Sequence, residues 1–293
     1  MRVVVVAAVV LAACSAGTAS SSSGSVVQVV AAENFWGDIA SQLGGSHAAV
    51  QSVVSDPNAD PHEYESNAND ARAIANAGLV ILNGAGYDSW ANKLLASSPD
   101  QGRKVLVVAD LLGKKPGDDP HFWYEPDFVA RVADAITAQY KSLDPNDSSY
   151  FEGRRSAFTA ALEPYMLRLM AIKQKFAGAP VGATESSFVY LADYLTLNLI
   201  SPPQFMQAVG EGNDPPAAAV VLFQNQIATK AIKVLVFNVQ TATAVTTNLK
   251  AGAMRQSIPI VGISETLQPA TASFQAWQLG QLVALENALE SSS

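Results

Sequence analysis

Short apolar runs alternate with longer amphipathic segments along most of the chain. In the first part, the runs rich in β-branched residues are residues 26–30, 49–54, 78–82 and 104–108. Three of these four runs are apolar almost throughout, which is typical of strands buried on both faces of a parallel sheet. Residues 69–77 and 87–95 show helical spacing, and Asn67 and Asp70 suit the start of the first of these helices. This part of the chain therefore predicts an α/β unit.

The same alternation returns in the last third of the chain. The apolar runs there are residues 179–184, 234–237 and 258–263. Residues 272–289 predict a closing helix, in which Phe274 and Trp277 lie on one apolar stripe. The sequence thus predicts an α/β protein of two lobes, each with a largely parallel sheet flanked by helices. The N-terminal lobe is expected at residues 26–125 and the C-terminal lobe at residues 178–293.

The segment between the lobes, residues 126–177, carries no strand signal. Pro126 suits the first turn of a helix, and apolar residues recur at helical spacing from Phe128 to Tyr140. Residues 149–176 then predict one helix of about 40 Å at 1.5 Å per residue. A flexible linker is rich in Gly and Ser, and this segment is not. We therefore expect one long helix to bridge the two lobes.

The N-terminus is typical of an exported lipoprotein. Arg2 precedes an apolar run that is too short to span a bilayer, so residues 1–13 predict a signal peptide. The run ends in Leu-Ala-Ala-Cys, which resembles a bacterial lipobox and predicts a lipid on Cys14. Residues 14–25 are rich in Ser and Gly and predict a flexible tether. The alternative is a plain signal peptide followed by an incidental cysteine. On the first interpretation, the lipid anchors the protein at the bacterial cell surface or the periplasmic face of the membrane.

Composition and charge narrow the possible ligands. Lys and Arg number 18 against 26 Asp and Glu, a net charge of −8, which argues against binding to nucleic acid. One cysteine excludes an internal disulfide framework and a zinc site built on two thiolates. Because the chain has only 3 His, any metal site must also use carboxylates.

Two of these histidines, His62 and His121, each follow an Asp-Pro dipeptide and precede an aromatic residue and a glutamate. Proline fixes φ, so each imidazole is presented from a stiffened loop, as a site with fixed ligand geometry requires. Taken singly, each histidine is better explained by a structural role at the surface or in the core. Their repetition in a chain so poor in histidine favours one shared metal site.

The two histidine motifs, residues 60–65 and 120–123, resemble the ligand motifs of the solute-binding lipoproteins of manganese and zinc ABC importers. Residues 32–40 are similar to the opening strand and helix of that family, and the resemblance covers nearly the whole mature chain. It implies two lobes bridged by a long helix, with a metal site in the cleft between them. It also implies that His62 and His121 bind the metal.

Two glutamates complete the ligand set that the resemblance implies. Glu185, in a Thr-Glu-Ser-Ser-Phe stretch, matches the third ligand in its manganese-receptor form. Glu265 stands where many relatives carry a ligating aspartate, which is the main departure from the family pattern. The alternative for Glu185 is a dipole partner of the following helix, and for Glu265 a glutamate at a helix entry. If Glu265 is not the fourth ligand, Asn238, Gln240 or water takes its place.

The resemblance implies a receptor that captures Mn²⁺ or Zn²⁺ and delivers it to the permease and ATPase of an ABC importer. A carboxylate-rich site favours Mn²⁺, whereas the general affinity order favours Zn²⁺. The chain is expected to be a monomer and not an enzyme. One alternative is a metal-dependent hydrolase, but such sites keep an open position for water, and H-E-x-x-H is absent. A surface adhesin is the other alternative.

Overall fold

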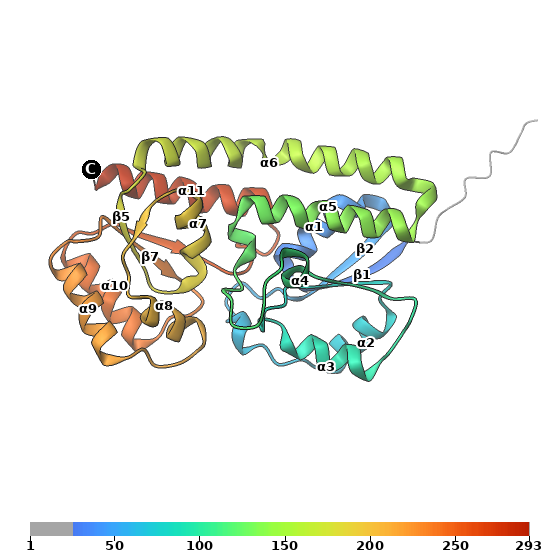
Figure 1. Ribbon diagram of the computed structural model, residues 1–293, viewed down its shortest axis with the longest axis horizontal. Coiled ribbons are helices and arrows are strands. Elements are labelled where there is room, and N and C mark those ends of the chain that lie inside the picture. Colours follow the sequence, from blue (N-terminus) through green and yellow to red (C-terminus); the bar gives the residue numbers. More distant parts are fainter. Residues whose placement is uncertain (1–25, 293) are drawn as a thin grey trace, which may run out of the picture.

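Two α/β lobes lie side by side beneath a long helix in the computed structural model, which describes residues 26–292 (Figure 1). The strands of the first lobe are β1 (Val27–Glu33), β2 (Ala48–Val54), β3 (Leu79–Leu82) and β4 (Lys104–Val107). Those of the second lobe are β5 (Pro180–Ala183), β6 (Asn198–Leu199), β7 (Val234–Asn238) and β8 (Ile260–Ile263). The strand orders are β2-β1-β3-β4 and β6-β5-β7-β8, and every pairing is parallel. The prediction of two parallel sheets is confirmed.

Helices cover both sheets. The first lobe carries α1 (Asn34–Gly44), α2 (Ala68–Asn76), α3 (Ser89–Ser97), α4 (Val108–Leu112) and the 3-10 turns η1 (Gly45–His47), η2 (Pro61–Glu63) and η3 (Phe122–Tyr124). The second carries η5 (Ser186–Phe188), α7 (Val189–Tyr194), α8 (Pro203–Gly210), α9 (Ala217–Ala228), α10 (Ala244–Arg255) and α11 (Phe274–Ser291). Strands β3 and β7 are buried along their whole length, as the apolar runs predict.

The expected long helix bridges the lobes. Helix α5 (Pro126–Leu143) leads through the turn η4 (Pro145–Asp147) into α6 (Ser148–Phe176), which has 29 residues and continues through Pro164. Helix α6 packs on α1 and α5 at one end and on α11 of the second lobe at the other (Figure 1). Its buried side chains include Phe158 and Leu169, which belong to a hydrophobic core shared by the two lobes.

Hydrogen bonds near α11 join the lobes a second time. The backbone N–H of Phe274 donates to Asp38 in α1 at 2.8 Å. Just before α11, the N–H of Leu267 donates to Asn34 Oδ1 at 3.1 Å, and Gln268 Nε2 donates to the carbonyl of Pro57 at 2.7 Å. The segment that follows β8 is therefore held by the first lobe as well as by the second.

The boundaries of some elements differ from those predicted. The helix expected at residues 87–95 is α3, which begins only at Ser89. The carboxylate of Asp88 accepts the backbone N–H groups of Asn83 and Gly84 and so holds the preceding segment as a turn. The two-residue strand β6 gave no sequence signal.

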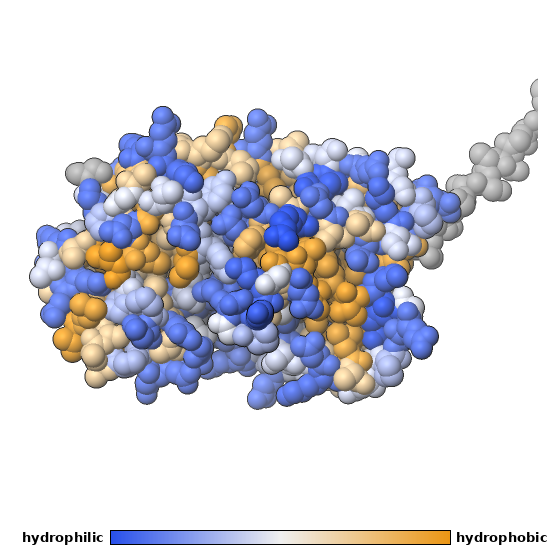
Figure 2. Space-filling model, in the orientation of Figure 1, coloured by the Kyte–Doolittle hydropathy of each residue, from blue (hydrophilic) through white to orange (hydrophobic). Residues whose placement is uncertain are grey.

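The surface mixes hydrophilic and hydrophobic residues over both lobes (Figure 2), as most protein surfaces do. Within residues 26–292 we find no helix with both the length and the apolar character needed to cross a membrane. The predicted signal peptide, Cys14 and the tether lie outside the residues that the structure describes.

Candidate metal centre

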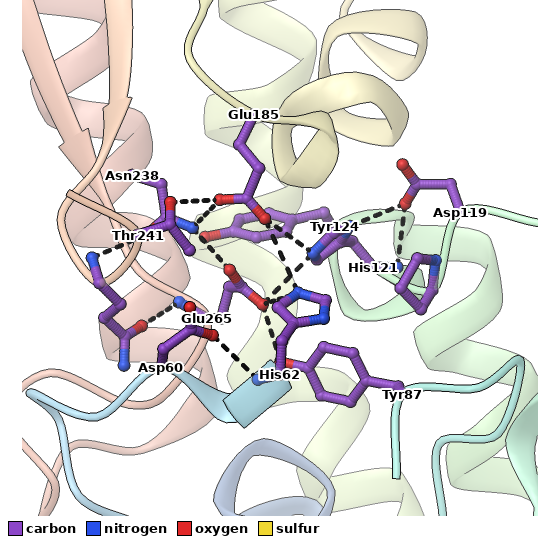
Figure 3. Close-up of polar contacts among 12 residues, drawn as sticks. Asp60, His62, Tyr87, Asp119, His121, Tyr124, Glu185, Asn238, Thr241 and Glu265 are labelled. Carbon is purple, nitrogen blue, oxygen red and sulfur yellow. Dashed lines mark hydrogen bonds and ion pairs between the residues drawn. The ribbon is translucent and has the colours of Figure 1, made fainter. Parts of the chain in front are cut away.

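Two of the four expected metal ligands closely follow strands, and the other two lie in longer loops. Glu185 follows β5 and Glu265 follows β8, while His62 lies in η2 after β2, and His121 directly precedes η3. Ligand sites of parallel α/β sheets lie at the carboxyl ends of the strands. The two lobes turn these ends toward each other, so the side chains converge between the lobes (Figure 3).

The aspartate of each Asp-Pro-His motif holds its histidine in place. Asp60 Oδ1 accepts the backbone N–H of His62 at 2.9 Å, and Asp119 Oδ1 accepts that of His121 at 3.0 Å. Asp119 Oδ1 also lies 2.8 Å from His121 Nδ1. A proton on Nδ1 then donates to Asp119, which leaves Nε2 free to bind a metal. Sequence reasoning identified the stiff proline in the motif but missed this role of the aspartate.

The four donor atoms have the spacing that one ion requires. His62 Nε2 lies 3.1 Å from Glu265 Oε2 and 3.8 Å from Glu185 Oε1. His121 Nε2 lies 3.3 Å and 3.5 Å from the same two oxygens. All four atoms lie within 4.8 Å of one another. Ligands bound tetrahedrally at about 2.1 Å stand about 3.4 Å apart, so a Zn²⁺-sized ion fits between them with little rearrangement.

Unpaired polar atoms mark the same place. Among the described residues, His62 Nε2 and Glu185 Oε1 are buried without a hydrogen-bond partner. A buried polar atom without a partner costs about 1–3 kcal/mol, and such atoms in native proteins often indicate a bound ion or water. The donor set and its unpaired atoms therefore suit a divalent cation.

Burial and mutual charge shift the pKa values of these groups. Burial lowers the pKa of His121, but the carboxylates of Asp119 and Glu265 outweigh it and raise that pKa well above its ordinary value. The pKa of His62 is raised on the same balance, with Glu265 as the main opposing charge. Burial also raises the pKa of Glu185, whereas the two histidines hold the pKa of Glu265 well below its usual range. The two histidines and Glu265 thus stabilise each other's charged forms.

Polar neighbours that the sequence did not single out as ligands fix the glutamates (Figure 3). The hydroxyl of Tyr87 donates to Glu265 Oε2 at 2.8 Å, and that of Thr241 donates to Glu185 Oε2 at 2.7 Å. Gln240 Oε1 accepts the backbone N–H of Glu265 at 2.5 Å. Asn238 and Gln240, the expected substitutes for a fourth ligand, therefore contact Glu265 itself. The only sequence signal for them was a polar stretch at the end of a strand.

A cavity of about 530 Å³ leads from the cluster to solvent. Tyr87 and Asp119 of the first lobe line it, together with Met206 and Gly210 of the second. His62 is the most accessible of the four ligand candidates, with 18% of its side chain exposed against 0–1% for the others. An ion entering through the cavity therefore meets His62 at the solvent side of the cluster.

The third histidine lies elsewhere. His47 Nδ1 is 3.1 Å from Asp147 and 3.8 Å from Asp144. Both aspartates belong to the turn between α5 and α6. Its ring packs on Tyr150 with a centroid distance of 4.2 Å. This group is more exposed than the interlobe cluster and offers three candidate donor residues instead of four. His47, the last residue of η1, thus contacts the turn η4 that precedes α6.

Residues 29–288 match the model of a protein family described as zinc-uptake complex component A, periplasmic (ZnuA). The match covers both lobes and all four residues of the interlobe cluster.

Relatives with assigned names are similar over part of their length. The manganese-binding lipoprotein MntA of Halalkalibacterium halodurans is 26% identical over 142 residues, 47% of this chain and 46% of that protein. The manganese ABC transporter substrate-binding lipoprotein PsaA of Streptococcus pneumoniae is 27% identical over 184 residues, 57% of this chain and 58% of that protein. The chain thus spans about half the length of these relatives.

The fold has been seen in solved structures. The periplasmic zinc binding protein TroA of Treponema pallidum superposes with a TM-score of 0.76 at 16% identity, over 92% of this chain and 99% of that one. The similarity places both parallel sheets and the bridging helix in a known architecture.

Proposed function

The chain belongs to the family of periplasmic zinc-uptake complex component A proteins, and from this we propose that it is an extracytoplasmic receptor that captures Mn²⁺ or Zn²⁺ for an ABC importer. His62, His121, Glu185 and Glu265 bind the ion, each through one atom. The observation that carries the proposal is their convergence within 4.8 Å, two from each lobe, in a buried position. The names of the relatives MntA and PsaA support manganese as one cargo.

Capture suits this site better than catalysis. A catalytic zinc site keeps an open coordination position for water and a general base beside it. Here four protein groups already converge on one position, and the other carboxylate oxygens are hydrogen-bonded. Uptake-complex components are also receptors and not enzymes, which decides against the hydrolase alternative.

The partners follow from this role. The permease and ATPase of the importer receive the ion, and a lipid on Cys14 holds the receptor at the outer face of the cytoplasmic membrane or at the cell surface. Both lobes and all four ligand candidates belong to one chain. The site is therefore complete in a single copy, and we expect a monomer.

Native mass spectrometry of the mature protein tests this function. The protein is offered equimolar Mn²⁺, Zn²⁺ and Fe²⁺, and we expect one tightly held Mn²⁺ or Zn²⁺ ion per chain. His121→Ala should lose that ion, whereas His47→Ala, the matched control outside the cluster, should keep it. A wild-type protein that retains no ion, or a His121→Ala variant that retains it fully, contradicts the proposal.

A further inference from the structure

Asn238, the last residue of β7, lies between the two glutamates of the interlobe cluster. Its Nδ2 donates hydrogen bonds to Glu185 Oε2 and, at 2.6 Å, to Glu265 Oε1 (Figure 3). The residue is 1% exposed, so water does not compete for these bonds. One amide group thus occupies one oxygen of each carboxylate.

The other end of the amide fixes its orientation. The backbone N–H of Gln240 donates to Asn238 Oδ1 at 3.0 Å, which identifies that atom as the oxygen. The backbone N–H of Asn238 donates to Thr184 Oγ1 at 3.2 Å and holds the residue in place. Both hydrogens of Nδ2 therefore point to the glutamates. The reversed amide would set its oxygen against two carboxylates.

Each glutamate is left with one oxygen for an ion. On Glu185, Oε2 also accepts from Thr241, and only Oε1 faces the two histidines. On Glu265, Oε2 faces both histidines, while Oε1 is taken by Asn238. The hydroxyl of Tyr87 uses a second lone pair of Glu265 Oε2 and limits its movement further.

We propose that Asn238 is a specificity-determining residue, which holds each glutamate to a single metal bond and so selects Zn²⁺ against Mn²⁺. With Glu185 Oε2 and Glu265 Oε1 occupied, the chain offers two nitrogens and two oxygens, the four-coordinate set that Zn²⁺ adopts. Mn²⁺ suits octahedral, oxygen-rich sites, to which bidentate carboxylates contribute the extra oxygens. The inference rests on the proposed function of the same site and adds the preferred ion.

This preference is opposite to the one that the donor types alone indicate. Two carboxylates offer up to four oxygens. Judged from the sequence alone, this number of oxygens favours Mn²⁺. The hydrogen bonds of Asn238 hold half of those oxygens turned away from the two histidines and so from the ion. Selectivity is then set by a residue that does not touch the cargo.

The first test uses the wild-type chain. X-ray absorption at the zinc edge of the Zn²⁺-loaded protein should show four nitrogen or oxygen ligands at about 2.0–2.1 Å. The crystal structure of the same complex should show one oxygen of Glu185 and one of Glu265 bound to the ion. A bidentate glutamate, or a shell of five or six ligands, overturns the proposal without any variant.

The second test removes the amide. In Asn238→Leu, of similar size, both glutamates are free to turn, and the ratio of the Mn²⁺ to the Zn²⁺ dissociation constant should fall by about tenfold or more. Competition titration with both ions measures this ratio. Asn248→Leu, the same change at an exposed position of α10 in the same lobe, should leave it unchanged.

The outcomes separate the two proposals. A folded Asn238→Leu protein with the wild-type ratio overturns the role of Asn238, although the wild type still binds metal. If circular dichroism shows that this variant does not fold, the number of ligands in the Zn²⁺-loaded wild-type protein becomes the test of the proposal. Wild-type protein that binds neither ion contradicts the receptor function instead.

Discussion

The imidazoles of His62 and His121 differ in their support, although each follows an Asp-Pro dipeptide. His121 is fully buried, and Asp119 contacts both its backbone N–H and its Nδ1. His62 is held by Asp60 through the backbone alone and has an edge-to-face contact with Tyr87, with ring centroids 4.7 Å apart. Of the two proposed ligands, His121 is therefore the more tightly held, and His62 has more room to adjust to an ion.

Replacing a ligand should remove the stabilisation that metal gives. A bound ion stabilises the folded chain by RT ln(1 + [L]/Kd), about 4 kcal/mol at a thousandfold excess over Kd. We expect each alanine variant to lose most of the metal-induced rise in melting temperature, measured against its own metal-free form. The four variants are His62→Ala, His121→Ala, Glu185→Ala and Glu265→Ala.

His47→Ala is the matched control for this series, because its ring belongs to the other acidic cluster. It should keep the full rise. If Glu265→Ala also kept it while the other three variants lost it, the fourth ligand would have to be another group, with Asn238, Gln240 or water next in line.

Metal affinity should weaken as pH falls through the raised pKa values of His62 and His121. The folded, metal-free chain has raised pKa values at His62 and His121, because Asp119, Glu185 and Glu265 stabilise their charged forms. Their protonation therefore stabilises the metal-free fold fully below the unfolded value near 6.5, and this contribution is lost as pH rises through the folded pKa.

The ion binds only the neutral imidazoles, so it competes with these protons. As pH falls, the apparent Kd of the ion should rise about tenfold per pH unit for each proton that the ion displaces. Metal titrations between pH 8.5 and 5 measure this slope. In the variant Asp119→Asn, the loss of metal affinity should begin at a lower pH than in the wild type. An affinity that is constant from pH 7.5 to 5 would remove both histidines from the site.

At the scale of single elements, α2 shows how a helix start supports the loop of His62. Asn67 accepts the backbone N–H of Asn69, and Asp70 accepts that of Asn67, which together form a capping box. Asp70 also accepts the hydroxyl of Tyr64 at 2.8 Å. The start of α2 thus fixes the chain two residues beyond His62.

Asn67→Ala should therefore cost about 1 kcal/mol of unfolding free energy, or about 2–4 °C in melting temperature for a chain of this size. The metal-induced rise should remain, because Asp60 still holds the backbone of His62. Calorimetry of metal-free and metal-loaded protein measures both. Asn76→Ala, at the exposed end of α2, should show no loss of stability, and an equal loss there would mean that the cap contributes nothing specific.

Most strands and the long helices were predictable from the sequence, since β3 and β7 are apolar on both faces and α6 has a continuous helical pattern. The helices α8 and α10 of the second lobe were not predicted. The two-residue strand β6 was not, because its pairing with β5 and not its composition makes it a strand. Helix α4 was not predicted either, since its five residues continue the apolar run of β4.

The site was predictable only in part. The repeated motif makes His62 and His121 candidate ligands without a structure, whereas the candidates Glu185 and Glu265 needed the family resemblance, because a glutamate after a strand is common. The role of Asn238 was beyond the sequence. It contacts glutamates 53 and 27 positions away, and only the meeting of three strand ends brings them together.

At the scale of the whole molecule, the membrane anchor is a separate matter from the fold. Cys14 is the one cysteine of the chain, so Cys14→Ser should abolish lipid attachment and leave the protein secreted or uncleaved. Detergent phase partitioning of wild type and variant measures this. A variant that still enters the detergent phase with the wild type would show that the lipobox interpretation is wrong.

The second connection between the lobes bears on how an ion leaves. Leu267 and Gln268, only two and three positions beyond Glu265, donate hydrogen bonds to Asn34 and Pro57 of the first lobe. Swinging the lobes apart would break these bonds and divide the core that they share. A turn of the His62 ring at the mouth of the cavity breaks none of them. Release of the ion by an opening of the lobes would therefore have to break these interlobe bonds as well as the bonds to the ion.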